Sequence, residues 1–206
     1  MFKLILASSS TARAKQLAQL GIDFDTVSPD IDETAKPGEN TDDLVLRLAQ
    51  EKAEKVARDF PDHWIIACDQ LAEFNGQNFG KPHTKEKALE TLMQFSGQTV
   101  LSKTGICLLN KNQNVLLTAL EPFSVIFRKY SKEDAQQYIA IDKPLHSAGS
   151  INIDSLGVVL IERYEGNDYN SVIGLPLITL VNLFQQAGVN LLSVAREKNG
   201  LNKIHT

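Results

Sequence analysis

The feature that most constrains the fold is an abrupt change near the start of the chain, from apolar residues to serines. Residues 4–7 (LILA) form a short apolar run that is typical of a buried strand, and residues 8–10 are three serines that indicate a turn. Ser10 is a favourable N-cap for a helix over residues 11–20. The sequence therefore predicts a strand, a tight turn and a helix in direct succession.

The predicted helix start is a candidate anion site. Backbone N–H groups lack partners in the first turn of a helix, and the helix dipole places partial positive charge there. Arg13 adds a fixed positive charge to this turn. Two interpretations stay open from this feature alone: a phosphate cradle, or an ordinary capped helix with Arg13 in solvent.

Composition limits the classes of function. Of the 206 residues, 43% are hydrophobic and 22% are charged, which suffices for the core of one domain or two small lobes. No apolar stretch approaches the roughly 18 residues of a membrane span, and no signal peptide is recognisable, so a cytoplasmic protein is expected. The net charge of −4 argues against nonspecific nucleic-acid binding. A phosphorylated small molecule would need local lysines and arginines and a divalent cation.

Strand-like and helix-like segments alternate, which predicts an α/β fold with mixed α+β character. The expected strands cover residues 64–68, 71–74, 77–79, 100–109, 115–127 and 158–161. Helices are expected after Thr41 and Ser131 as N-caps, from Thr84, and around Pro176 in a first turn. The pair at 75–76, Asn-Gly, favours a type I′ hairpin, so the sheet is expected to be mixed. The two common nucleotide-binding signatures, G-x-G-x-x-G and G-x-x-x-x-G-K-[ST], are absent.

Lys52 stands out in the second predicted helix. Apolar residues between Val45 and Val56 form a stripe along one face of this helix, and Lys52 falls near the centre of the stripe. A lysine in this place either extends to water or meets an anion, and both interpretations stay open. Arg47 and Glu51 fall on the opposite face, where solvated charges are expected.

Three further polar residues lie where a site could form. Asp69 ends the apolar run of residues 65–68, and a carboxylate at the end of a buried strand could be a general base, a metal ligand or a strand-ending cap. Glu33 lies in a polar loop, where it could be a second oxygen ligand for magnesium or an ordinary exposed acid. Lys81, in a Gly-Lys-Pro turn, could meet a phosphate or extend into solvent.

Together these residues provide positive charge for phosphates and oxygen ligands for a cation and a water. The set comprises Arg13, Lys52 and Lys81 with Glu33 and Asp69. It suits hydrolysis of a phosphoanhydride, in which positioning and charge neutralisation supply most of the rate. The histidines show no metal-ligand spacing, and His83 is expected at the surface.

The combination resembles the Maf family of nucleoside triphosphate pyrophosphatases. The matching segments run in the family's order through about residue 188: LILASSS with Arg13, Asp32-Glu33, RLAQEKA with Lys52, CDQ with Asp69, FGKP with Lys81, FSG, HSAGSINIDSLG and GLPL. Each motif is short, but all of them in one order are specific to the family.

The resemblance implies an elongated mixed sheet flanked by helices, with two lobes around a central nucleotide cleft. It implies hydrolysis of a nucleoside triphosphate between the α and β phosphates with magnesium or manganese, and it makes a homodimer plausible. Carried over by position, Asp69 matches the family's proton acceptor, and Glu33 matches its metal-associated acid beside Asp69. The phosphate contacts match Ser8, Arg13, Lys52 and Lys81.

Within the family, the chain resembles the branch that acts on 7-methyl-GTP. The branch for dTTP and UTP usually has Asp-Thr where this chain has Asp69-Gln70, and glutamine where it has Asp154. A carboxylate at Asp154 could accept hydrogen bonds from guanine and attract the cationic ring of 7-methylguanine. Thr11 and Ala12 replace the family's usual proline and its tryptophan or arginine, so Ala12 cannot stack on a base.

The sequence thus predicts one domain over residues 1–206, with a flexible tail over 196–206, that hydrolyses 7-methyl-GTP to 7-methyl-GMP and pyrophosphate. Its expected partner is the nucleotide, with no nucleic acid and no membrane. Two alternatives stay open: a dTTP and UTP pyrophosphatase of the same family, and a nucleotide-binding regulator of cell division with little turnover.

Overall fold

The protein is built on one elongated mixed sheet. The computed structural model describes residues 2–198, and within them the seven strands have the order β2-β1-β3-β5-β6-β7, with β4 beside the second half of β3. The strands are β1 (Leu4–Leu6), β2 (Asp25–Thr26), β3 (Trp64–Phe74), β4 (Gln77–Phe79), β5 (Thr99–Asn110), β6 (Val115–Phe127) and β7 (Ile161–Gly166). β1 runs parallel to β2 and β3, and the other pairs are antiparallel. The predicted mixed sheet is confirmed.

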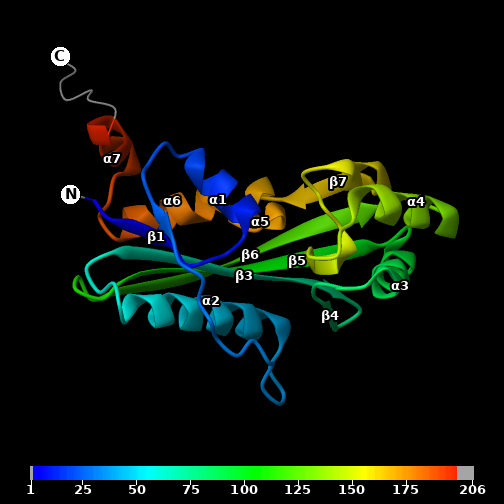
Figure 1. Ribbon diagram of the computed structural model, residues 1–206, viewed down its shortest axis with the longest axis horizontal. Coiled ribbons are helices and arrows are strands. Elements are labelled where there is room, and N and C mark those ends of the chain that lie inside the picture. The colour runs from blue at the N-terminus through cyan, green and yellow to red at the C-terminus, as the bar shows by residue number, and fades with distance from the viewer. Residues whose placement is uncertain (1, 199–206) are drawn as a thin grey trace.

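Helices cover both faces of the sheet and one of its ends (Figure 1). The long helix α2 (Thr41–Ala57) lies along one face, and α1 (Thr11–Ala18), α5 (Tyr169–Ile173) and α6 (Leu177–Gln186) lie along the other. At the far end are α3 (Lys85–Phe95) and α4 (Lys132–Asp142), whereas α7 (Leu191–Lys198) lies near the N-terminal end of the sheet. Among residues 2–198, no helix has the length and apolarity that crossing a membrane requires.

The alternation of side chains along β3 assigns the site residues to opposite faces. Ile65 and Ala67 belong to the apolar cluster under α2, while Ile66 and Cys68 belong to the cluster under α1 and α6. Because successive side chains of a strand point to opposite faces, the side chain of Asp69 points to the face covered by α2, and that of Gln70 points to the face covered by α1 and α6.

Asp69 lies in the middle of β3, so the prediction that it ends the strand is wrong. It nevertheless lies at a local edge of the sheet. The pairing of β1 with β3 stops at Ile66, and the pairing of β4 with β3 begins at Ala72. Along this edge, no strand within residues 2–198 pairs with residues 67–71. The gap exposes a short stretch of an otherwise buried strand, which is where a ligand can reach it.

Two details of the predicted elements are corrected. Most of the expected strand over 158–161 is a 3-10 helix, η2 (Leu156–Leu160), in which the N–H of Val158 bonds back to the carbonyl of Ser155, and only Ile161 belongs to a strand, as the first residue of β7. The N-cap of α2 is Asn40, whose side chain accepts from the N–H of Asp43, so Thr41 is the first helical residue instead of the cap. The flexible tail over residues 196–206 stays a prediction: residues 196–198 belong to the end of α7, and residues 199–206 lie outside the described residues.

Gly105, which pairs with Asp69 across β3 and β5, lets α2 approach the sheet beside the gap. A Cβ atom at this position would lie 2.3 Å from the carbonyl oxygen of Val45 in α2. Gly105→Ala should therefore lower the free energy of unfolding by about 2 kcal/mol, because backbone must move to remove the overlap. Urea denaturation measures the change. Gly80→Ala is the matched control, since its nearest atom would be 3.9 Å away; equal losses in both variants would contradict this account of Gly105.

Candidate active site

Several chain segments meet at the gap in β3. The serine turn enters it from the end of β1, and the Gly-Lys-Pro turn enters it from the end of β4. The segment after α4 closes the far side, where the N–H of Gly149 donates to the carbonyl of Gly80. A single cavity of about 930 Å³ lies between these segments. All nine predicted site residues line it: Ser8, Ala12, Arg13, Glu33, Lys52, Asp69, Gln70, Lys81 and Asp154.

Lys52 lies between two carboxylates at the edge of this cavity. Its Nζ is 2.6 Å from Oδ1 of Asp69 and 2.8 Å from Oε1 of Glu33. The Lys52 and Asp69 side chains are only 8% and 11% exposed, whereas that of Glu33 is 58% exposed. Lys52 thus meets anions, and the interpretation that it extends freely to water is wrong. The buried position in the stripe of α2 fixes the ammonium, and Glu33 reaches it from the loop.

The electrostatic environment of Glu33 shows that positive charges converge on the same place. Burial acts to raise the pKa of Glu33, but the hydrogen bond from Lys52 outweighs it, together with the charges of Lys52, Lys81 and Arg13, so the pKa is lowered overall. Since Lys81 belongs to the turn after β4 and Arg13 to α1, charges from distant segments act at one carboxylate.

The start of α1 has the predicted cap and an oriented arginine. The side chain of Ser10 accepts from the N–H of Arg13, and the hydroxyl of Ser8 accepts from the N–H of Ser10. The Nε of Arg13 donates to the carbonyl oxygen of Gly174 at 2.9 Å. Gly174 has φ of +134°, and a Cβ there would lie 3.2 Å from that Nε, so glycine leaves room for the guanidinium. The GLPL motif therefore contributes to the site by directing Arg13.

Gln70 lies on the floor of the cavity with its amide held in one orientation. Its Nε2 donates to the hydroxyl of Ser102 at 2.9 Å and to the carbonyls of Ser171 and Val172, each at 3.0 Å. Backbone carbonyls only accept, so the nitrogen must face them. The carbonyl oxygen Oε1 then receives no hydrogen bond from residues 2–198 and remains an acceptor.

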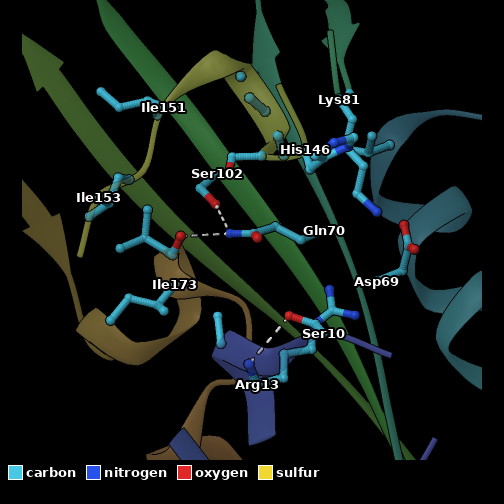
Figure 2. Close-up of a pocket in the computed structure, with 18 of the residues that line it drawn as sticks. Ser10, Arg13, Asp69, Gln70, Lys81, Ser102, His146, Ile151, Ile153 and Ile173 are labelled. Atoms are coloured by element: carbon cyan, nitrogen blue, oxygen red, sulfur yellow. Dashed lines mark hydrogen bonds between the residues drawn. The ribbon is translucent and has the colours of Figure 1, made fainter. Parts of the chain in front are cut away.

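The cavity has a charged side and an apolar side. Figure 2 shows Lys81, His146 and Asp69 on one side, with Ile151, Ile153 and Ile173 across from them and Gln70 between. Arg13 lies below, beside the serine turn. A ligand that fits this division carries negative charge at one end and a flat or apolar group at the other.

Known proteins are similar to this chain in sequence over most of its length. The model for the family described as Maf-like protein matches residues 3–187. The chain belongs to the Maf family. A curated relative from Nitrosococcus oceani, named 7-methyl-GTP pyrophosphatase, is 44% identical over 92% of this chain and 95% of its own length. A second relative with the same name, from Pseudomonas aeruginosa, is 42% identical over 91% of this chain and 98% of its own length.

The fold also occurs outside close relatives of this Maf-family chain. The solved structure of the Staphylococcus aureus Ham1 protein is 15% identical, covers 90% of this chain and 99% of its own, and superposes with a TM-score of 0.50. This likeness supports the α/β fold with its mixed sheet.

In this Maf-family chain, Glu33 and Asp69 would hold a divalent cation. Both carboxylates contact one ammonium, so they lie close together, and Oδ2 of Asp69 and Oε2 of Glu33 receive no hydrogen bond from residues 2–198. The described residues contain no group of three or more side chains with metal-binding potential. Magnesium fits such a pair, because it usually takes one or two carboxylates together with substrate phosphates and waters.

Sequence reasoning missed several residues of the site in this Maf-family chain. Ser102 and Ser171, which hold Gln70, come from β5 and α5, and no local motif marks them. His83 and His146 line the cavity with ring centroids 6.1 Å apart, although they are 63 positions apart in sequence; His83 is exposed, as expected, and its place at the cavity is what the sequence did not indicate. The expectation that Arg47 is solvated is wrong, since its side chain is 15% exposed and forms ion pairs with Glu39 and Glu51.

Proposed function

We propose that the protein is a nucleoside triphosphate pyrophosphatase that converts 7-methyl-GTP to 7-methyl-GMP and pyrophosphate. The observation that carries the proposal is the contact of the buried Lys52 ammonium with Asp69 and Glu33 at a cavity that also holds Arg13 and Lys81. Two relatives at 44% and 42% identity that carry this name support it. Hydrolases that act on acid anhydrides need such a concentration of positive charge and carboxylate.

In the proposed reaction, a water oxygen forms a bond to the α-phosphorus. The bond from that phosphorus to the oxygen shared with the β-phosphorus breaks, and pyrophosphate leaves with the electron pair. Asp69 accepts the proton of the water at Oδ2, the oxygen that Lys52 does not contact. Lys52 holds the carboxylate in place through Oδ1 at 2.6 Å.

The positive groups around the cavity bind the triphosphate. Arg13 and Lys81 supply charge from opposite sides of the gap, and Ser8 and the first turn of α1 supply hydrogen-bond donors. Magnesium or manganese on Glu33 and Asp69 would add charge neutralisation for the phosphate oxygens. These groups act on charge that develops on the leaving pyrophosphate, which is the interaction that accelerates the reaction.

The base occupies the apolar side of the cavity in this proposal. Ile153 and Ile173 provide flat contact in place of the aromatic or arginine side chain that Ala12 lacks. The free Oε1 of Gln70 and the carboxylate of Asp154, at the exposed rim, are both acceptors. Guanine carries donors on N1 and the 2-amino group, and the positive charge of a 7-methylguanine ring favours the carboxylate further.

The wider setting of the enzyme is also proposed. We propose one domain whose two lobes border the cavity, and a protein that works in the cytoplasm and assembles as a homodimer. Its partner is the nucleotide, without nucleic acid or membrane, in keeping with the net charge of −4.

Pyrophosphate release from 7-methyl-GTP, GTP, dTTP, UTP and CTP, with magnesium or manganese, tests the proposal. We expect kcat/KM for 7-methyl-GTP to exceed that for each other nucleotide by about 10-fold or more, because unmatched polar groups penalise the wrong base. Asp154→Ala should reduce the preference for 7-methyl-GTP over GTP. Faster turnover of dTTP or UTP would overturn the base assignment and keep the chemistry, whereas binding without turnover would favour a regulatory protein.

A further inference from the structure

The carboxylate of Glu33 is placed by a loop that has no regular secondary structure. Residues 31–40 connect the region after β2 to α2 and are mostly exposed. The Glu33 side chain is 58% exposed, and its one ion pair within residues 2–198 is the contact with Lys52. A side chain this exposed cannot fix its own position, so the loop must be held by other contacts.

Arg47 holds this loop through an unusually complete set of hydrogen bonds. Its Nε and one terminal nitrogen bind the two oxygens of Glu39 at 2.5 and 2.7 Å, which is a bidentate pair. The same terminal nitrogen donates to the carbonyl of Thr34 at 3.1 Å, and the other donates to Glu51 at 3.1 Å. The side chains of Arg47 and Glu39 are 15% and 8% exposed. Arg47 therefore binds the loop at Thr34, directly after Glu33, and at Glu39, near the end of the loop.

The loop is also braced from within. The N–H of Thr34 donates to Asp32, and the N–H of Lys36 donates to the same Glu39 carboxylate that Arg47 binds. The hydrogen bond from Arg47 lowers the pKa of Glu39 to about 2, so the pair remains ionised at neutral pH. Planar bidentate pairs of this kind add geometric precision, which a lysine cannot reproduce.

We infer that Arg47 is a positioning residue that holds Glu33 at Lys52 and thereby completes the cation site. Arg47 and Lys52 both project from α2, so one rigid helix holds the loop at Thr34 and Glu39 and receives Glu33, the residue directly before the Thr34 anchor. This role deepens the proposed function and rests on it. Arg47 contacts neither the cavity nor the carboxylate of Asp69.

The test compares Arg47→Met with Arg58→Met, which removes an exposed arginine from the end of the same helix. Binding of Mn²⁺ is measured by calorimetry on protein saturated with an α,β-methylene analogue of GTP, which cannot be cleaved between its α and β phosphates. We expect Arg47→Met to weaken Mn²⁺ binding by about 10-fold or more, as for other residues that orient a metal ligand. With saturating Mn²⁺, kcat should stay within about threefold of the wild type. Arg58→Met should change neither quantity.

Hydrogen exchange of the nucleotide-free protein provides a second readout that needs neither metal nor turnover. Arg47→Met should speed hydrogen exchange in residues 31–40 and leave exchange in β3 and β5 unchanged. Glu39→Gln removes the same ion pair from the loop side and should change exchange in the same direction, so it replaces Arg47→Met if that variant does not fold. Unchanged exchange in that segment, or unchanged Mn²⁺ binding, would overturn the inference. A wild type that neither binds the analogue nor hydrolyses 7-methyl-GTP would defeat the proposed function, while normal loop exchange in Arg47→Met would defeat the role of Arg47 by itself.

Discussion

Asp69→Asn should lower kcat for pyrophosphate release by about 10²–10⁴-fold, because an amide cannot accept the proton of the attacking water at neutral pH. Asparagine has nearly the same volume, and its Oδ1 can still accept the hydrogen bond that Lys52 donates at 2.6 Å. Lys52 also retains Glu33 at 2.8 Å, so the substitution leaves no buried ammonium without a partner. The fold and KM should therefore change far less than kcat.

Initial rates at saturating nucleotide and metal measure the effect, and thermal unfolding checks the fold. Asp59→Asn is the matched control, since it removes an exposed aspartate beyond the end of α2. Full turnover by Asp69→Asn would exclude Asp69 as the proton acceptor. A large rise in KM with an unchanged kcat would instead assign Asp69 to binding of the ground state.

The sequence predicts the local parts of this site well. The strand, serine turn and capped helix at the start of the chain follow from hydrophobic pattern and capping chemistry, which act over a few residues. The hairpin between β3 and β4 is confirmed, with positive φ at both Asn75 and Gly76, as a type I′ turn requires. The central place of Lys52 in an apolar stripe is likewise a property of one helix and can be read from its period.

Non-local features could not be read in this way. That Asp69 lies in mid-strand yet at an open edge depends on where β1 stops and where β4 begins to pair, which is a matter of register between distant segments. Arg47 falls on the polar face of α2 by periodicity, and only the folded loop of residues 31–40 gives it partners. The support of Gln70 by Ser102 also requires two strands in register.

Lys52→Met should lower kcat by about 10²–10³-fold and at the same time tighten Mn²⁺ binding to the free protein. The loss of rate follows from removing a buried positive charge that orients Asp69 and lies beside the bound phosphates in the proposed reaction. The gain in metal affinity follows from competition, because Nζ contacts both carboxylates that would hold the cation. Methionine suits the apolar stripe, and Glu33, at 58% exposure, can turn to solvent, so the protein should remain folded.

This pair of opposite changes separates Lys52 from an ordinary structural lysine. Calorimetry with Mn²⁺ and no nucleotide measures the affinity, and initial rates with 7-methyl-GTP measure kcat. Lys55→Met, one turn away and exposed, should leave both values near those of the wild type. If Lys52→Met kept wild-type kcat and gained stability, Lys52 would merely be a tolerated charge in a core helix. If kcat and metal affinity fell together, Lys52 would help to shape the cation site, and it would not compete with the cation for the two carboxylates.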